Sequence, residues 1–216
     1  MTASRLGARV VTVIDLQIQN ILSVENALQV VGAHVEVVRD VTAISKADLL
    51  VLPGVGSFRA AAERLQGSGM SAAIRDHVLV RKRPVVGLCL GMQLLADFSE
   101  EHGIHAGLGL IPGNVVRLED APPEYRVPNV GWREVTLNQE ALNILPTALD
   151  RRSYYHVHSY HFRTADPKHS TGTSVFGPAT IASVVQKDNV FGTQFHPEKS
   201  QEAGLDLLHA LVTGLR

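Results

Sequence analysis

The sequence predicts an α/β fold of three layers, in which helices flank a largely parallel central sheet with a small antiparallel sheet beside it. Strand-like and helical segments alternate along the first hundred residues, as in parallel, doubly wound sheets. The strand-like runs are continuously apolar, which suits a sheet covered on both faces. After about residue 107, short strand-like runs rich in glycine and proline follow instead, and these suit antiparallel strands.

The elements of the first half follow from hydrophobic periodicity. Residues 9–15 form an apolar strand, and apolar residues from Ile21 to Val31 then recur at helical spacing until Gly32 ends the helix. Further along, the sequence predicts strands at 34–38 and 48–52, a helical region at 70–80, a strand at 83–86 and a helix at 92–98.

The second half is predicted to be mostly strand, with one closing helix. Ser200 is expected to cap that helix, and leucine and valine residues stripe one side of it. The predicted strands are residues 114–118, 132–137, 153–162, 180–186 and 190–194, and residues 120–124 are predicted to be a surface loop. The 216 residues contain no repeat or linker, so we expect a single domain spanning residues 1–216.

Composition excludes several classes of function. The formal net charge of −1 gives no electrostatic basis for binding nucleic acid or a membrane surface. A single cysteine excludes an internal disulfide and suits a reducing compartment. The first residues contain no long apolar segment, and no apolar run reaches membrane-spanning length, so we expect a cytoplasmic location.

That single cysteine lies in a G-x-C-x-G motif formed by Gly87, Cys89 and Gly91. Such a motif between a strand and a helix is typical of a nucleophile elbow, in which glycines let the backbone crowd close to the nucleophile. The start of a helix also favours the reactive thiolate. The alternative is an unreactive cysteine buried in the core. The two glycines and the strand–turn–helix context favour the nucleophile.

A general base for this thiol is predicted at His196, with Glu198 to orient it. In an extended backbone, side chains two residues apart project to the same side, and Pro197 between them restricts the backbone. The carboxylate could then hold one ring nitrogen while the other faces Cys89. Taken alone, the same tripeptide could be a surface turn with an incidental histidine.

A third segment, the glycine-rich sequence P-G-V-G at residues 53–56, follows the predicted strand at 48–52. Backbone N–H groups of such a loop can approach a ligand closely and stabilise a developing oxyanion. We expect one oxyanion donor from Gly54 or Val55 and a second from Leu90. By itself this loop could equally be an ordinary turn.

Together these motifs resemble those of the class I, triad-type glutamine amidotransferases. The segments P-N-V-G-W at 128–132 and Y-H-V-H-S-Y at 155–160 further resemble the glutaminase subunits of imidazole glycerol phosphate synthase, an enzyme of histidine biosynthesis. The resemblance implies hydrolysis of L-glutamine to glutamate and ammonia by Cys89, His196 and Glu198. It also implies that Gly56, Gln93, Ser159 and Tyr160 bind the substrate.

The resemblance further implies a heterodimer with a (β/α)₈-barrel cyclase. This cyclase would use the ammonia to make imidazole glycerol phosphate and an aminoimidazole carboxamide ribotide. Asn20, Trp132 and Lys199 would lie at the interface, although Trp132 could instead be a core residue and Lys199 a solvated one. Open alternatives are a glutaminase serving another synthase, such as a sugar amidotransferase, a non-catalytic regulatory module, and a thiol hydrolase acting alone.

Two other features complete the sequence-based interpretation. His156, His158 and His161 could suit a metal, but no further ligand motif supports one, so we expect neutral, hydrogen-bonded histidines and neither metal nor cofactor. The family usually has a glycine-rich turn ending in Gly-Asn after its first strand, whereas residues 15–20 here lack glycine. We expect this loop to follow a different path and to affect coupling to the partner.

Overall fold

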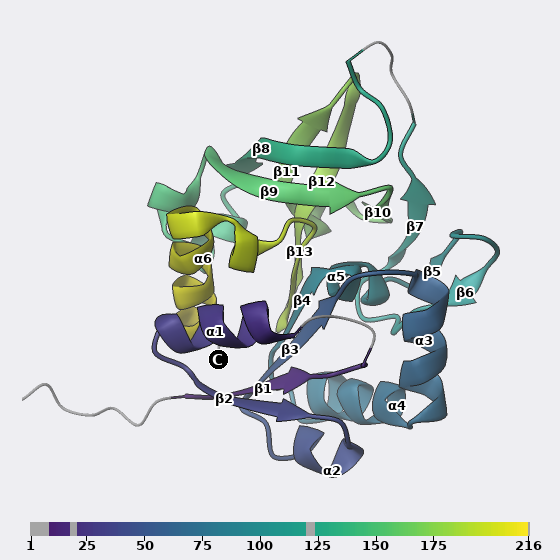
Figure 1. Cartoon of the computed structure of the whole chain (residues 1–216), viewed down its shortest axis with the longest axis vertical. Helices are drawn as coiled ribbons and strands as arrows, with labels where there is room; N and C mark the ends of the chain where they lie inside the picture. Colours follow the sequence, from purple (N-terminus) through teal and green to yellow (C-terminus); the bar gives the residue numbers. More distant parts are fainter. Residues whose placement is uncertain (1–8, 18–20, 120–123, 216) are drawn as a thin grey trace, which may run out of the picture.

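The computed structural model describes residues 9–17, 21–119 and 124–215, and within them the chain forms two sheets and their covering helices (Figure 1). The larger sheet has nine strands in the order β2-β1-β3-β4-β13-β12-β11-β8-β9. Its strands are β1 (Val10–Ile14), β2 (His34–Val38), β3 (Leu49–Gly54), β4 (Val85–Cys89), β8 (Asn129–Leu137), β9 (Arg152–His158), β11 (Ser170–Phe176), β12 (Ala179–Lys187) and β13 (Val190–Thr193).

The strand directions confirm the predicted architecture. Strands β2, β1, β3, β4 and β13 pair in parallel, and β12, β11, β8 and β9 continue the same sheet with antiparallel pairs. A second sheet runs in the order β10-β7-β5-β6, with antiparallel pairs except for the parallel pair β5–β7. Its strands are β5 (Phe98–Ser99), β6 (His105–Ala106), β7 (Gly113–Arg117) and β10 (Tyr160–Thr164).

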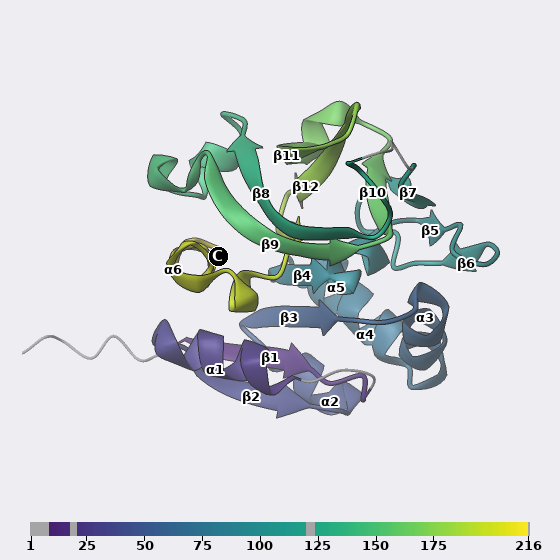
Figure 2. The same ribbon diagram turned by 45° about the horizontal axis from the view of Figure 1, so that its top comes forward.

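Helices cover both faces of the parallel half of the sheet, which gives the three layers visible in Figures 1 and 2. Along β3, Leu49 and Val51 pack with α1 and α6, whereas Leu50 and Leu52 pack on the opposite face with α3, α4 and α5. The helices are α1 (Leu22–Val30), α2 (Val41–Ile44), α3 (Phe58–Gly67), α4 (Met70–Arg75), α5 (Leu90–Leu94) and α6 (Gln201–Gly214). Among the described residues, we find no helix with both the length and the hydropathy of a membrane-spanning segment.

Most elements predicted from the sequence are present, but α2, α3, β5, β6 and β11 were not predicted. Helix α3 could have been predicted from a capping residue and from the spacing of its apolar residues. The Ser57 hydroxyl accepts a hydrogen bond from the Ala60 amide at 3.3 Å, and buried residues recur at helical spacing from Phe58 to Leu65. Residues 120–123 of the predicted surface loop lie outside the described residues.

Two local predictions were wrong. The helix expected at 92–98 already ends at Leu94, because the carbonyls of Leu94 and Leu95 accept hydrogen bonds from the backbone of residues 108–111. Ser200 does not cap α6 with its side chain. Its hydroxyl instead donates to the His196 carbonyl at 2.6 Å and accepts from the Tyr155 amide at 3.0 Å.

The close approach of α5 to β3 makes a specific prediction about Gly91. A Cβ atom at this position would lie 1.7 Å from the Leu52 carbonyl oxygen. We expect Gly91→Ala to reduce the free energy of unfolding by about 3 kcal/mol or more, because backbone would have to move. The matched control is Gly67→Ala at the exposed end of α3, where a Cβ meets nothing within 4 Å. This change should be neutral or stabilise by about 0.5–1 kcal/mol. Equal stabilities of the two variants in urea unfolding would contradict the prediction.

Candidate active site

Cys89 lies at the end of β4, where the chain turns sharply into α5. Its φ of 53° and ψ of −108° are unusual for a non-glycine residue. The turn needs both glycines, since a Cβ at Gly87 would lie 2.5 Å from the Gly91 carbonyl oxygen and a Cβ at Gly91 would meet Leu52. Cys89 is buried, with 6% of its surface exposed. This geometry confirms the strand–turn–helix elbow predicted around Cys89.

The sheet brings three distant segments to one edge. Within β3 and β4, Gly54 lies opposite Cys89, and Thr193 of β13 lies opposite Leu88. Because these strands are parallel, their carboxyl ends meet at the edge where ligands usually bind in such sheets. Residues that follow β13, including His196, are thereby delivered beside Cys89.

His196 and Glu198 form a buried pair. The Nδ1 atom of His196 lies 2.8 Å from Oε1 of Glu198, and the two side chains are 3% and 4% exposed. The contact was predicted, but the extended backbone expected between the two residues was wrong. Residues 197–199 form a 3₁₀ turn instead. The turn still holds both side chains on one side of the chain.

The remaining ring nitrogen of His196 faces the thiol. Nε2 has no hydrogen bond of ordinary geometry within the described residues. Burial lowers the pKa of His196, but its interactions with Cys89 and with Glu198 outweigh burial and raise the pKa to about 10. The imidazole is therefore strongly disposed to hold a proton when paired with Cys89.

The predicted oxyanion segments lie next to this pair. A Cβ on Gly54 would lie 2.7 Å from the Cβ of Leu90, so the two backbones are in close approach. Gly54 and Val55 also line a small cavity together with His196 and Glu198. The base and the first of the two backbone segments thus line one small cavity, and the second segment begins directly after Cys89.

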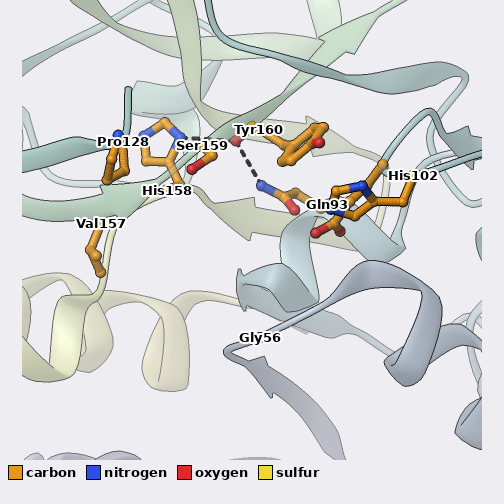
Figure 3. Close-up of a pocket in the computed structure, with 9 residues that line it drawn as sticks. Gly56, Gln93, His102, Pro128, Val157, His158, Ser159 and Tyr160 are labelled. Atoms are coloured by element: carbon orange, nitrogen blue, oxygen red, sulfur yellow. Dashed lines mark hydrogen bonds between the residues drawn. The ribbon is translucent and has the colours of Figure 1, made fainter. Parts of the chain in front are cut away.

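A larger cavity of about 350 Å³ adjoins these residues (Figure 3). All four residues predicted to bind substrate line it, namely Gly56, Gln93, Ser159 and Tyr160. The other lining residues were not assigned to the substrate site from the sequence, and they are Glu101, His102, Pro128, Val157 and His158. Glu101 is the acidic residue of this wall, and its Oε2 accepts the Phe58 amide at 2.7 Å.

Two buried glutamines connect this cavity to the thiol. Nε2 of Gln93 donates to the Tyr160 carbonyl at 2.9 Å, drawn in Figure 3, and to Oε1 of Gln194 at 3.1 Å. Nε2 of Gln194 in turn donates to the Cys89 sulfur at 3.8 Å. Gln194 was missed in the sequence analysis, and its position two residues before His196 was the signal that could have found it.

In the histidine cluster, His156 and His158 are buried and His161 is half-buried, and this burial favours the neutral form of all three. Burial lowers the pKa of His156 to about 4, of His158 to about 3 and of His161 to about 4. Nδ1 of His156 lies 3.0 Å from the Tyr154 carbonyl, and Nδ1 of His158 lies 2.9 Å from that of Tyr160. Across the residues described, no group of three or more metal-ligating side chains could hold an ion.

Two of the three residues expected at the partner interface reach the surface. Trp132 is 43% exposed, so its alternative assignment to the core was wrong, and Lys199 is exposed as well. The Trp132 ring packs edge-on against the Tyr155 ring, with 6.1 Å between the ring centroids. The neighbouring Val130 and Val157 are also exposed. Asn20 lies outside the described residues.

The unusual loop after β1 is described up to Gln17. The carboxylate of Asp15 forms an ion pair with Arg39 at 2.7 Å and accepts a hydrogen bond from the Gln17 backbone amide at 2.7 Å. Gln17 has a φ of 58°, and its side-chain oxygen accepts from Arg64 at 2.8 Å. The loop therefore begins with a positive φ at a residue other than glycine, held by side-chain contacts.

Comparison with known proteins gives a consistent result. Residues 12–211 match the family model described as glutamine amidotransferase class-I. The chain is 41% identical to imidazole glycerol phosphate synthase subunit HisH of Rhodospirillum rubrum, covering 92% of this chain and 95% of the relative. It is 42% identical to the subunit of the same name of Moorella thermoacetica, over 93% and 92%. The structure of PurLQS from Thermotoga maritima aligns over 97% of this chain and 100% of the other, with a TM-score of 0.73 at 18% identity.

The buried histidines predict a loss of stability in acid. Because their folded pKa values lie below the ordinary value of 6.5, the unfolded chain binds more protons as the pH falls below 6.5. Between about pH 7 and pH 5.5, each histidine should cost about 1 kcal/mol of unfolding free energy. His196 acts in the opposite direction, since its raised pKa favours folding over the same window.

His156→Gln should therefore reduce the acid sensitivity of urea unfolding by about 1 kcal/mol over that window. His209→Gln, at an exposed position on α6, is the control and should leave it unchanged. If His156→Gln retains the full acid dependence, the neutral state assigned to His156 is wrong.

Proposed function

This chain belongs to the class-I glutamine amidotransferase family and, within it, to the HisH subunits of imidazole glycerol phosphate synthase, and we propose that Cys89, His196 and Glu198 carry its chemistry. The function is hydrolysis of the side-chain amide of glutamine to glutamate and ammonia. One observation supports these roles above the others. A thiol on a strained elbow and a base oriented at 2.8 Å meet beside a cavity lined by every predicted substrate residue.

In the proposed mechanism, the Cys89 sulfur attacks the carboxamide carbon of glutamine while His196 holds the proton removed from the thiol. Collapse of the tetrahedral intermediate breaks the carbon–nitrogen bond, and His196 gives its proton to the leaving ammonia. A glutamyl thioester remains. His196 then removes a proton from water, which attacks the thioester, releases glutamate and restores the thiol. Glu198 keeps the imidazole oriented and stabilises its charged form.

The oxyanion of the tetrahedral intermediate needs donors at the elbow. We assign them to the backbone N–H of Leu90 and to that of Gly54 or Val55, since these segments approach closely beside Cys89. A single donor of this kind contributes about 2.7–4 kcal/mol to the transition state. Glycine at position 54 allows this close approach, because a side chain there would collide with Leu90.

The cavity wall supplies groups for the amino-acid end of glutamine. Glu101 can pair with the α-ammonium group, and its hydrogen bond from the Phe58 amide fixes the carboxylate in position. Both N–H groups of Gln93 are engaged by Tyr160 and Gln194, so Gln93 offers its oxygen to the same ammonium. Gly56, Ser159 and Tyr160 are assigned to the α-carboxylate, for which their backbone and hydroxyl donors are suited.

Ammonia released here is best used by a partner rather than by water, because free ammonia is mostly protonated near neutral pH. The names of the relatives denote a subunit of a synthase. We propose that the partner is a (β/α)₈-barrel cyclase that forms a heterodimer with this chain in the cytoplasm. The exposed apolar surface of Val130, Trp132 and Val157 supports this proposal, since Val157 also lines the substrate cavity. Lys199, one residue after Glu198, would contact the same partner.

The same interpretation proposes a single domain over residues 1–216 and chemistry that needs no cofactor. The family match covers residues 12–211 as one segment, which supports the first point. Thiol, imidazole, carboxylate and backbone donors together account for each step of the hydrolysis, which supports the second.

The nucleophile assignment is tested by Cys89→Ala in the assembled synthase. We expect glutamine-dependent product formation to fall by at least about 10⁴-fold, because no thioester can form. Ammonium salt should still drive the partner's reaction at the wild-type rate, since only the ammonia source is lost. Glutamate release by Cys89→Ala near the wild-type rate would overturn the mechanism. Loss of the ammonium-driven reaction would indicate damage to the partner or its interface.

The partner surface is tested by Trp132→Ala. Truncating a half-exposed aromatic ring in an interface should weaken affinity for the cyclase by about 10–100-fold, while glutamine hydrolysis by the isolated chain stays unchanged. Val80→Ala is the matched control, because Val80 is 73% exposed and precedes β4, away from the catalytic edge. Calorimetric titration with the cyclase gives the affinities. Wild-type affinity in Trp132→Ala would exclude this surface.

A further inference from the structure

Gln194 is a buried polar side chain for which the proposed mechanism has no role. It follows β13 directly and is fully buried, with 0% exposure. Its backbone amide donates to the Ser183 carbonyl at 2.9 Å, which extends the pairing of β13 with β12 by one residue. The side chain is thereby placed between Gln93 and Cys89, where it makes one hydrogen bond to each.

The direction of these hydrogen bonds is fixed by a backbone carbonyl. The Tyr160 carbonyl can only accept, so the group of Gln93 that faces it at 2.9 Å must be the amide nitrogen. The second hydrogen of that nitrogen points to Gln194, which must therefore present its oxygen, at 3.1 Å. Rotating the Gln194 amide by half a turn would place two NH₂ groups against each other. Its nitrogen is consequently directed at the Cys89 sulfur, at 3.8 Å.

A donor directed at sulfur distinguishes between the two forms of the nucleophile. An N–H group stabilises an anionic sulfur more than a neutral one, because hydrogen bonds to charged acceptors are the stronger ones. The site is buried and excludes most water, which strengthens the effect. Gln194 thus complements His196, which approaches the same sulfur and holds the proton.

We propose that Gln194 is a positioning residue that favours the thiolate of Cys89 on one side and fixes the substrate-binding orientation of Gln93 on the other. The second role rests on the proposed function, because it takes Gln93 as a ligand of glutamine. The first role concerns the thiol alone. The chain of hydrogen bonds from Tyr160 to Cys89 then links occupancy of the substrate cavity to the state of the nucleophile.

Two substitutions at Gln194 separate these roles in the full-length chain. Gln194→Glu keeps an oxygen toward Gln93 but replaces the donor to sulfur with a carboxylate. Gln194→Met has similar length and removes both hydrogen bonds. The control is Gln186→Met on β12, since Gln186 is a half-buried glutamine that lines a different cavity and whose Oε1 has no partner.

The first measurement is the rate of Cys89 alkylation by iodoacetamide at neutral pH without glutamine. We expect both Gln194 variants to react about tenfold more slowly than the wild type, and Gln186→Met to react at the wild-type rate. Thiolate absorbance near 240 nm should fall in parallel. Rates within about twofold of wild type in both Gln194 variants would overturn the proposal, as would equal slowing in the control.

The second measurement is the KM for glutamine. We expect it to rise about tenfold in Gln194→Met and to change little in Gln194→Glu, while kcat falls in both. An equal KM in the two variants would refute the role in orienting Gln93. If the wild type releases no glutamate, the proposed function fails, and the alkylation rates still decide the role at the thiol.

A third variant guards against misfolding at a buried position. Gln93→Leu does not touch the sulfur but removes the group that fixes the Gln194 amide. We expect its alkylation rate to fall by about threefold, which is less than the effect of losing the donor itself. Alkylation at the wild-type rate in Gln93→Leu would refute the link between the cavity and the nucleophile.

Discussion

The contact between the elbow and strand β3 is the constraint on which the rest of the site depends. The backbone at Gly91 lies so close to the Leu52 carbonyl that no Cβ atom fits between them. That proximity holds α5 at a fixed distance from β3, which in turn sets Leu90 beside Gly54 and Cys89 at the sheet edge. The unusual backbone of Cys89 is therefore supported by packing on both sides.

The histidines at the site differ in their charge state. His156 and His158 are kept uncharged by burial, whereas His196 is strongly disposed to hold a proton by its two partners. His156 and His158 lie on β9, and the His196 amide donates to the Tyr155 carbonyl of the same strand. Because the imidazoles of His156 and His158 are uncharged, they add no positive charge near His196. The charge of protonated His196 is then balanced by Glu198 and the Cys89 thiolate.

The sequence predicted the features that depend on local pattern. Apolar runs identified the parallel strands, and the glycines around Cys89 identified the elbow, because both signals lie within a few residues. Gln194 and Glu101 were missed because their roles arise from contacts with residues distant in sequence: Gln194 approaches Cys89, and Glu101 accepts from Phe58. The short length of α5 was also unpredictable locally, since the amides of residues 108–111 donate to the carbonyls of residues 94–96, where the helix would have continued. The residue type alone could not show whether Trp132 lies in the core or at the surface, because this depends on which face of β8 the rest of the sheet covers.

The tie between α6 and the catalytic turn also bears on how the protein is made. Ser200 bonds to the His196 carbonyl, and Gly204 lies so near the Pro197 carbonyl that a Cβ would be 1.8 Å away. Helix α6 is synthesised last among the described elements, and it packs against α1, which is synthesised first among the helices. A chain still emerging from the ribosome therefore has its nucleophile long before its base is held in place.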